Sequence, residues 1–476
     1  MKPDYDLIVI GGGAAGLVAA TGGAMMGAKT ALIEKNKLGG DCTWYGCIPS
    51  KALLKSSQVF SLLKHSDKYG ISSAQGAKFD TDNVMPHVRS IIKEISSHHP
   101  AGVFEKKGIK VLFGAPKFVD NKTILLDGKR MSAKRFIICT GSHPMVPPIE
   151  GLKDIDYLTN ENIFDLEALP ESITVLGGGP IGIELSQALA RLGVKVSIVE
   201  MFDRILFRED EELARVLREN LVKDGVKIYA GKKAVKFSKN RQSVTVTIED
   251  KDKKLSTVTS ERVLVAVGRS ANVRGLDLEK AGVKYSNKGI EADKTLKTDA
   301  PNIYAAGDIV GPYQFSHIAE YQAIIALGNA LLPFKRAVDY GAVPWCTFTE
   351  PELAHLGLTE VEARSQYKNV NVYRSQYSAN DRAVTDLQKE GMAKVICDKK
   401  GKILGAHIVG ANAGELIHEY VLAKSAKLSI DKLSSSIHIY PTLSQVVKSS
   451  ADQRYMSVMS SGWFKAMMKF FIKILR

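Results

Sequence analysis

The stretch from Gly39 to Lys51 reads GGDCTWYGCIPSK, and the rest of the chain can be interpreted around it. Its cysteines, Cys42 and Cys47, have four residues between them, a gap short enough for a small-loop disulfide and longer than that of thioredoxin-type motifs. Pro49 suits the first turn of a helix, because its missing N–H has no intrahelical partner there. Cys47 is therefore expected at the positive end of a helix, which favours a thiolate and redox chemistry. Lys51 follows about one turn later.

Length and composition describe a folded protein of several domains. A chain of 476 residues, 45% apolar and 24% charged, is too long for one ordinary core, and roughly two to four domains are expected. Outside the motif, Cys139, Cys346 and Cys397 lie in apolar runs typical of strands, where a buried free thiol is the expected interpretation. This use of cysteine suits a reducing cytoplasm.

The charge pattern and the apolar runs argue against several classes of protein. The net charge of +14 tolerates acidic partners, but no helix-turn-helix, zinc-ligand spacing or basic stretch interleaved with aromatic residues is present. Neither nucleic acid nor a resident metal ion is therefore expected. The apolar run from Leu7 to Ile10 is too short for a signal peptide, and no segment approaches the roughly 20 apolar residues of a membrane-spanning helix. A cytoplasmic protein is expected.

A first glycine motif lies close to the start of the sequence. An apolar strand from Tyr5 to Ile10 leads into a glycine turn and an Ala-rich helix, which is the context that a dinucleotide fingerprint requires. A second strand ends in Glu34, 23 residues after the first glycine, where its carboxylate can accept hydrogen bonds from an adenosine ribose. The glycines of this motif are Gly11, Gly13 and Gly16.

The same arrangement returns in the middle of the chain. The apolar run from Ile173 to Leu176 leads into a second glycine turn, and Glu200 again follows the first glycine by 23 residues. One such motif would be weak evidence, whereas two with the same spacing indicate two dinucleotide sites. The glycines of the second motif are Gly177, Gly179 and Gly182.

Taken together, these motifs resemble the class I pyridine nucleotide-disulfide oxidoreductases, the flavoprotein family of dihydrolipoamide dehydrogenase, glutathione reductase and mercuric reductase. The resemblance runs in order along roughly residues 4–450. It implies an α/β fold with two Rossmann-like dinucleotide-binding domains, one for FAD and one for NAD, and a C-terminal α+β dimerisation domain. A homodimer follows, in which each active site is completed by the partner chain.

The resemblance also divides the chain into five parts. They are an FAD-binding domain with the redox disulfide at 1–150, an NAD(H)-binding domain at 151–275, a central segment that completes the FAD site at 276–340, a dimerisation domain at 341–455 and a basic amphipathic tail at 456–476.

In this family the first glycine motif binds FAD and the second binds a nicotinamide nucleotide. The other FAD-binding positions fall at Thr140, Gly141, Gly268, Asp308 and Ser316. The counterpart of Asp308 bonds the ribityl or pyrophosphate part of FAD, although an Asp here could also be only a helix cap. The helix beginning at Ser316 would point its positive end at the flavin.

The carboxylate of Glu200 bears on the choice of coenzyme. It suits a free ribose 2′-OH and would repel a 2′-phosphate, so NADH is favoured over NADPH. Arg204 is the one nearby residue that would favour a phosphate.

The family also assigns roles at the redox centre. Electrons from NADH pass by way of the flavin to a Cys42–Cys47 disulfide, with Cys47 next to the flavin and Cys42 exchanging with the substrate. Lys51 lies by the flavin and pairs with Glu184. The alternative for Glu184 is a solvated position on a helix.

The segment from Ser436 to Gln445 departs from the family pattern. Members with thiol substrates carry a catalytic histidine before its proline and a glutamate five residues later, where this chain has Tyr440 and Gln445. A tyrosine, with a reference pKa near 10, is a poor general base at neutral pH. His438 is the alternative proton carrier.

This departure predicts an acceptor whose reduction does not require protonating a thiolate, such as a soft metal ion, a quinone or a low-pKa disulfide. The alternative is a dihydrolipoamide dehydrogenase in which His438 acts as acid and base. A flavin-bound redox sensor or a membrane-associated binding protein is the alternative of another class.

The tail carries a basic stripe on an apolar helix. Lys465, Lys469 and Lys473 recur every four residues, with Arg476 beside them and Trp463 at the other end. Basic amphipathic helices with a terminal Trp lie in membrane interfaces, so peripheral contact with the inner face of a membrane is expected. The alternative is a helix docked on its own dimer.

Overall fold

The computed structural model describes residues 2–72 and 80–475. These residues fold into two compact units, each made of several chain segments. The first unit comprises residues 1–177, 191–194 and 234–339, and the second comprises 178–190, 195–233 and 340–476, apart from the residues that are not described. The boundaries of the five parts expected from the sequence stay a prediction. No helix among the described residues is long and apolar enough to cross a bilayer.

The first unit is built on a seven-stranded sheet with the order β3-β2-β1-β6-β5-β4, in which β18 also pairs with β6. Strands β1, β2, β3, β6 and β18 run parallel, and β4 and β5 add an antiparallel edge. The elements of this sheet and its helices are β1 (Tyr5–Ile10), α1 (Ala14–Met25), β2 (Thr30–Glu34), α2 (Gly40–Trp44), α3 (Cys47–Lys64), α4 (Val84–Ser96), α5 (Ala101–Glu105), β3 (Lys110–Phe113), β4 (Lys117–Asp120), β5 (Thr123–Leu126), β6 (Lys129–Ile138), β18 (Ile303–Ala305) and α8 (Ser316–Leu331).

Smaller strands complete the first unit. Strands β8 and β14 run parallel, and β11, β12 and β13 form a three-stranded sheet. These strands are β7 (Ser142–Pro144), β8 (Ser172–Leu176), β11 (Lys233–Lys239), β12 (Val244–Glu249), β13 (Leu255–Ser260), β14 (Arg262–Val265), β15 (Arg269–Ala271), β16 (Tyr285–Ser286) and β17 (Gly289–Ile290).

The second unit holds a five-stranded antiparallel sheet with the order β19-β20-β23-β22-β21 and a parallel pair, β9 and β10. Its elements are α6 (Pro180–Arg191), β9 (Lys195–Glu200), α7 (Glu211–Lys223), β10 (Lys227–Ala230), β19 (Pro344–Thr347), β20 (Glu352–Gly357), α9 (Glu360–Gln366), β21 (Val370–Gln376), α10 (Asp381–Thr385), β22 (Met392–Asp398), β23 (Ile403–Gly410), α11 (Ala413–Ser425), α12 (Ile430–Ser435), α13 (Gln445–Met459) and α14 (Gly462–Ile474). The antiparallel sheet with its helices confirms the α+β character expected for the C-terminal domain.

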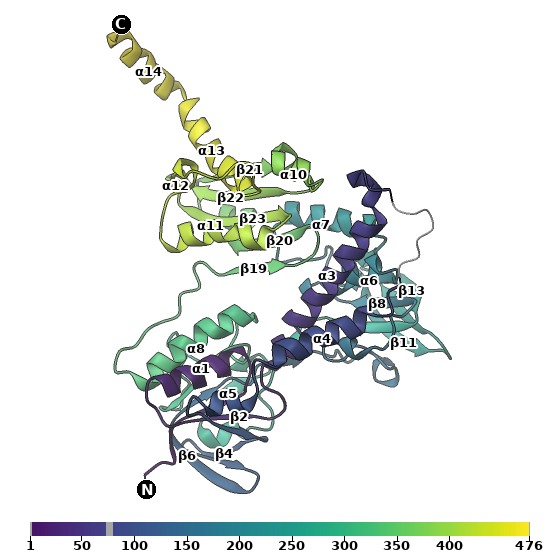
Figure 1. The fold of residues 1–476 in the computed structure, drawn as a ribbon, viewed down its shortest axis with the longest axis vertical. Helices are drawn as coiled ribbons and strands as arrows, with labels where there is room; N and C mark the ends of the chain where they lie inside the picture. The colour runs from purple at the N-terminus through teal and green to yellow at the C-terminus, as the bar shows by residue number, and fades with distance from the viewer. Residues whose placement is uncertain (1, 73–79, 476) are drawn as a thin grey trace. The chain divides into compact units, whose positions relative to one another are not determined.

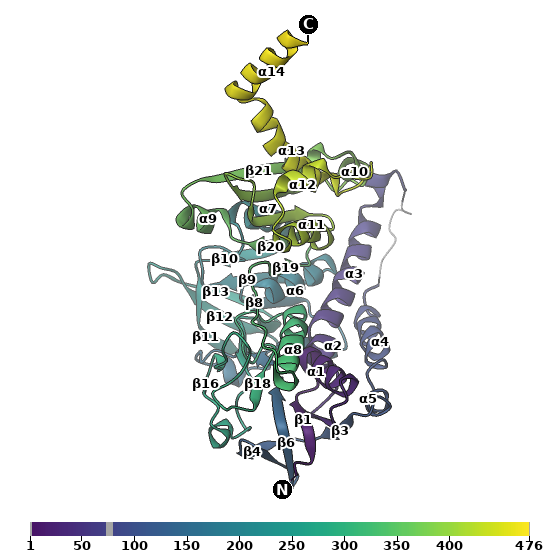
Figure 2. The same cartoon turned by 90° about the vertical axis from the view of Figure 1, so that its left-hand side faces the viewer.

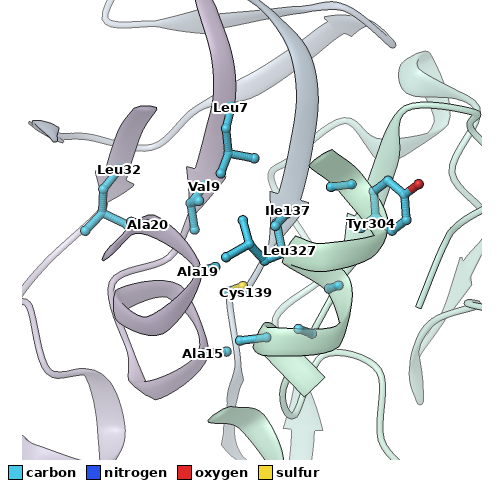
Figure 3. Packing of buried hydrophobic residues seen from close by; sticks show 14 of the residues in the cluster. Leu7, Val9, Ala15, Ala19, Ala20, Leu32, Ile137, Cys139, Tyr304 and Leu327 are labelled. Atoms are coloured by element: carbon cyan, nitrogen blue, oxygen red, sulfur yellow. The ribbon is translucent and has the colours of Figure 1, made fainter. Parts of the chain in front are cut away.

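Strand β1 explains why the main sheet is covered on both faces. Its side chains alternate, so Leu7 and Val9 point to one face while Ile8 and Ile10 point to the other, and all four are buried. Figure 3 shows Leu7 and Val9 directed toward α1 and toward Leu327 of α8. A parallel sheet buried on both faces confirms the Rossmann-like architecture.

Helices α1 and α8 lie side by side on one face of this sheet (Figure 1). Gly22 makes their close approach possible, because a Cβ there would lie 2.5 Å from Cδ2 of Leu327. Since α8 begins at Ser316, this packing fixes where the first turn of α8 points.

Leu327→Ala should lower the free energy of unfolding by about 2–5 kcal/mol, because it leaves a cavity between α1 and α8. Adding Gly22→Ala should recover part of that loss, since the new methyl group enters the vacated space. The coupling, expected at about 0.5–3 kcal/mol, is measured by a double-mutant cycle in urea unfolding. Strictly additive effects would contradict this account of the helix contact.

Candidate active site

The two cysteines lie at the junction of α2 and α3. Helix α3 begins at Cys47, two residues before Pro49, so Cys47 is itself the first helical residue and the expected positive helix end is confirmed. Gly40, the first residue of α2, has a φ of +60°, and a Cβ on it would lie 2.6 Å from Cα of Gly13. The glycine pair at 39–40 therefore lets the cysteine segment touch the first glycine turn through backbone alone.

A second helix N-terminus, that of α8, lies beside the sulfur atom of Cys47. Ser316, the first residue of α8, places its Oγ 3.5 Å from Sγ of Cys47. Hydrogen bonds from the Cys42 thiol and from Ser316, with the positive charge of Lys51, lower the pKa of Cys47 to about 6. The same contact with Cys47 raises the pKa of Cys42. The pair is thus one thiolate and one thiol at neutral pH.

A charged network holds the cysteine segment in place. Oδ1 of Asp41 in α2 forms an ion pair with Nη2 of Arg269 at 3.0 Å, and the side-chain amide of Asn160 donates to Asp41 Oδ1 and to the Tyr45 carbonyl. Arg269 is nearly buried, with 10% of its side chain exposed. It therefore fixes the backbone around Cys42 from a distant part of the chain.

The same arginine reaches the aspartate expected to contact FAD. Nε of Arg269 donates to Oγ of Ser142, which in turn donates to Asp308 at 2.6 Å. Burial raises the pKa of Asp308, opposed by the Ser142 hydrogen bond and the charge of Arg269. The arginine thus links the cysteine segment to Asp308, a connection that the sequence interpretation missed. The only signal was its place directly after Gly268 in a strand-to-turn motif.

The first glycine turn is built for a close backbone approach. Gly11 has a φ of +107°, and a Cβ on Gly16 would lie 1.7 Å from the Gly11 carbonyl oxygen, so neither position accepts a side chain. Gly13 has room for a Cβ, whose nearest heavy atom would be Cα of Gly40 at 3.7 Å, and it caps α1 without a side-chain hydrogen bond. The first helical N–H groups are therefore available to a pyrophosphate, and the residues present fit FAD.

The acidic residues after the two glycine turns have the same contacts. Glu34 accepts from the Gly12 N–H at 2.6 Å and from the Asn36 N–H at 2.7 Å. Glu200 accepts from the Gly178 N–H at 2.6 Å and from the Phe202 N–H at 2.8 Å. Each carboxylate thus holds its own glycine turn, and its role toward a ribose stays a prediction. This repetition supports the interpretation of two equivalent nucleotide sites.

The remaining glycines of the second turn have matching geometry. Gly177 has a φ of +105°, and a Cβ on it would lie 2.4 Å from the Ala266 carbonyl oxygen, while a Cβ on Gly179 would meet nothing within 4 Å. Gly182 is buried in α6. The second glycine turn therefore repeats the first, with one glycine that has no room for a side chain and another that has.

Thr140, Gly141 and Gly268 shape the backbone rather than offer side chains to a ligand. Thr140 Oγ1 donates to the Asn272 carbonyl at 3.0 Å, and the Asn272 amide donates back to the Thr140 carbonyl at 2.8 Å. Gly141 and Gly268 have φ values of +68° and +135°. Their role as FAD-binding positions stays a prediction that rests on backbone placement.

Glu184 is not a solvated helix position. Only 4% of it is exposed, and its Oε1 accepts from the Phe348 N–H at 2.8 Å, so that alternative is wrong. Lys51 donates to Oγ of Ser50 at 3.3 Å. The expected pair between Lys51 and Glu184 stays a prediction.

The two proton carriers expected near Pro441, His438 and Tyr440, already have polar partners in the protein. Nε2 of His438 lies 2.9 Å from Glu419, and Nδ1 lies 3.1 Å from the Ser436 carbonyl oxygen. Tyr440 donates its hydroxyl proton to Asp381 at 2.9 Å, which raises the pKa of Tyr440.

Gln445 has a structural role in the same loop. Its amide donates to the carbonyl oxygens of His438 and Ile439 at 3.2 and 3.4 Å, where the family pattern would place an acid that orients a histidine. The loop thus departs from the family pattern as the sequence predicts, with Gln445 bonded within the loop and with His438 and Tyr440 bonded to carboxylates of α11 and α10.

Comparison with known proteins gives a match over most of the chain. The family described as pyridine nucleotide-disulphide oxidoreductase matches residues 5–323, and its dimerisation domain matches residues 343–451. Dihydrolipoyl dehydrogenase of Rhizobium etli is 34% identical over 97% of this chain and 100% of its own length. Mercuric reductase of Staphylococcus aureus is 33% identical over 94% of this chain and 82% of its own length.

Solved structures show the same likeness. The HOCl-induced flavoprotein disulfide reductase RclA of Escherichia coli has a TM-score of 0.85 and 27% identity, covering 94% of this chain and 99% of its own. Its Cu(II) complex has a TM-score of 0.84 and 26% identity, covering 95% of this chain and 100% of its own.

Replacing Cys42 should show how much the hydrogen bond from its thiol contributes to the low pKa of Cys47. In Cys42→Ala the largest hydrogen bond to Cys47 is lost, so the pKa of Cys47 should rise above about 6. In Cys42→Ser an O–H donor remains, and the pKa should stay closer to that value. The measurement is the rate of alkylation of Cys47 by iodoacetamide against pH, read by mass spectrometry. Identical profiles for the two variants would contradict the hydrogen-bond account.

Proposed function

Because the chain belongs to the pyridine nucleotide-disulphide oxidoreductases, which use a flavin and a pyridine nucleotide, we propose that its Cys42–Cys47 pair carries electrons from NADH to an acceptor that needs no histidine acid–base group. The observation that carries this proposal is the sulfur pair itself, with the pKa of Cys47 lowered to about 6 and that of Cys42 raised. When bound, FAD supplies the two-electron carrier between the nicotinamide and the disulfide.

In the last step the reduced cysteine pair passes its electrons to the acceptor, and the electrons and the proton released can be counted on the two cysteines. In the reduced pair, Cys47 is a thiolate and Cys42 a thiol. When the S–S bond forms again, the pair gives up two electrons and the one proton of Cys42. Two electrons reduce one divalent mercury ion to the metal or two Cu(II) ions to Cu(I), and neither product takes a proton. Such an acceptor therefore places no demand on a general acid.

A soft metal ion is the acceptor class that we place first. Mercuric reductases are among the relatives, and RclA has been solved with Cu(II). Thiolates are the protein ligands that soft metal ions prefer. A quinone, whose reduction protonates oxygen atoms and no thiolate, and a disulfide whose thiols have a low pKa remain in the acceptor class.

The engaged histidine argues against ordinary dihydrolipoamide turnover. A dithiol substrate must lose and regain protons, and a positioned acid–base group usually contributes about 10²–10⁴ in rate. Both ring nitrogens of His438 already face acceptors, and Tyr440 is bonded to Asp381. A dihydrolipoamide dehydrogenase using His438 is the second candidate.

The preference for NADH rests on two side chains. Glu200 is only 7% exposed and keeps a carboxylate at the end of β9. Arg204, the residue that could have favoured a 2′-phosphate, donates instead to the carbonyl oxygens of Leu206, Phe207 and Glu209. Its guanidinium is therefore used to hold the loop after β9.

The dimerisation domain supports a homodimer. Ile437 and Ile439 flank His438 and are 101% and 78% exposed in one chain. Two large apolar side chains in one loop suit burial against a second copy of the chain.

The first test distinguishes a metal ion from lipoamide as the electron acceptor. The purified flavoprotein should oxidise NADH with Cu(II) or Hg(II) at a rate at least about a hundredfold above its rate with lipoamide. His438→Gln, which keeps a donor for Glu419, should leave the metal-dependent rate within about twofold, since no proton passes through that ring. Fast lipoamide turnover that His438→Gln abolishes would instead establish the second candidate.

The coenzyme assignment has its own test. Glu200→Gln removes the negative charge and keeps a hydrogen-bonding side chain at the glycine turn. The ratio of kcat/KM for NADPH to that for NADH should rise roughly five- to tenfold, which corresponds to one charge repulsion of about 1 kcal/mol screened as in water. Steady-state kinetics with both coenzymes measure it. An unchanged ratio would mean that Glu200 does not face the 2′ position.

A further inference from the structure

Helix α14 lies outside the part of the chain that the family match covers. The dimerisation domain matches up to residue 451, whereas α14 spans Gly462–Ile474. It follows α13 after a break at Ser460 and Ser461, and none of its residues is buried. Figures 1 and 2 show it leading away from the sheet of its own unit. Nothing in the family's chemistry accounts for this helix.

The helix has two distinct faces. At about 100° per residue, Lys465, Lys469 and Lys473 fall within about 80° of its circumference, and apolar side chains fill an opposite arc of roughly 200°. The apolar arc is open: Trp463 is 64% exposed, and Phe470 and Ile474 are each 62% exposed. Residues 453–475 contain no acidic side chain that could offset the lysines. This combination calls for a partner that is apolar inside and anionic at its surface.

A bilayer with anionic lipid has that chemistry. Thirteen residues make a helix about 20 Å long, which is shorter than the roughly 30 Å hydrocarbon core, so α14 fits along the interface and not across it. A second copy of the chain fits less well, because it would bring three more lysines and the same net charge of +14.

We propose that α14 is an interfacial helix that binds the enzyme to membranes containing anionic lipid. Its apolar arc enters the boundary of headgroups and acyl chains, Trp463 lies at the level of the headgroups, and the three lysines contact lipid phosphates. The inference goes beyond the proposed function, because it does not depend on the acceptor. Arg476 belongs to the same basic stretch in the sequence but lies outside the described residues.

Vesicle flotation of the purified flavoprotein tests the proposal. The protein should float with phosphatidylcholine vesicles that contain phosphatidylglycerol, and much less with phosphatidylcholine alone. Binding should weaken in high salt. The triple variant Lys465→Gln, Lys469→Gln, Lys473→Gln should bind the anionic vesicles on the order of a hundredfold more weakly.

A matched control removes the same charge elsewhere. Lys106→Gln, Lys288→Gln and Lys400→Gln together replace three lysines that are exposed in turns elsewhere in the chain, and binding should stay within about threefold of the unchanged protein. Anionic vesicles should also shift the Trp463 emission to shorter wavelength, and Trp463→Phe should abolish that shift.

Three results would overturn the proposal. They are no flotation of the full chain, equal flotation with neutral and anionic vesicles, and equal losses in the two triple variants. A lower oligomeric mass for a chain ending at Ser460, together with no flotation, would assign α14 to contact between copies. NADH-dependent ferricyanide reduction in every variant reports the folded flavoprotein, so failure of the proposed acceptor leaves this test unaffected.

Discussion

Two helix N-termini meet at the sulfur of Cys47, and the rest of the site depends on that meeting. Cys47 is the first residue of α3 and Ser316 the first residue of α8, with their side chains 3.5 Å apart. Both helix ends favour negative charge on the Cys47 sulfur, and the hydrogen bond from the Cys42 thiol does most to lower the pKa of Cys47. A stable thiolate beside a protonated thiol is the state that a dithiol needs before it can transfer two electrons.

Backbone packing brings those helix ends together. Gly40 lets the cysteine segment touch Gly13, and Gly22 lets α1 lie close to α8, whose first residue is Ser316. Asp41 and Arg269 then tie the cysteine segment to β15, which begins at Arg269. A side chain at Gly40 or at Gly22 would move a helix end, so the position of the Cys47 sulfur depends on both of these glycines.

Local features of this site could be predicted from the sequence, and long-range ones could not. The glycine turns, the start of α8 at Ser316 and the helix after Cys42 follow from patterns within a few residues. The contact between Cys47 and Ser316 joins residues 269 positions apart, and no local pattern encodes it. Arg269 was missed for the same reason. Glu184 was expected to pair with Lys51, and the alternative of a solvated helix position is wrong because α6 is buried on several sides.

The most direct measurement is the long-wavelength absorbance of the flavoprotein, reduced with one equivalent of NADH without oxygen, against pH. A Cys47 thiolate next to oxidised flavin gives such a band, and the account predicts that it is strong at neutral pH and lost as pH falls through about 6, where Cys47 takes a proton. Full flavin bleaching without a band, or a band that forms only near the ordinary pKa of a thiol, would contradict it.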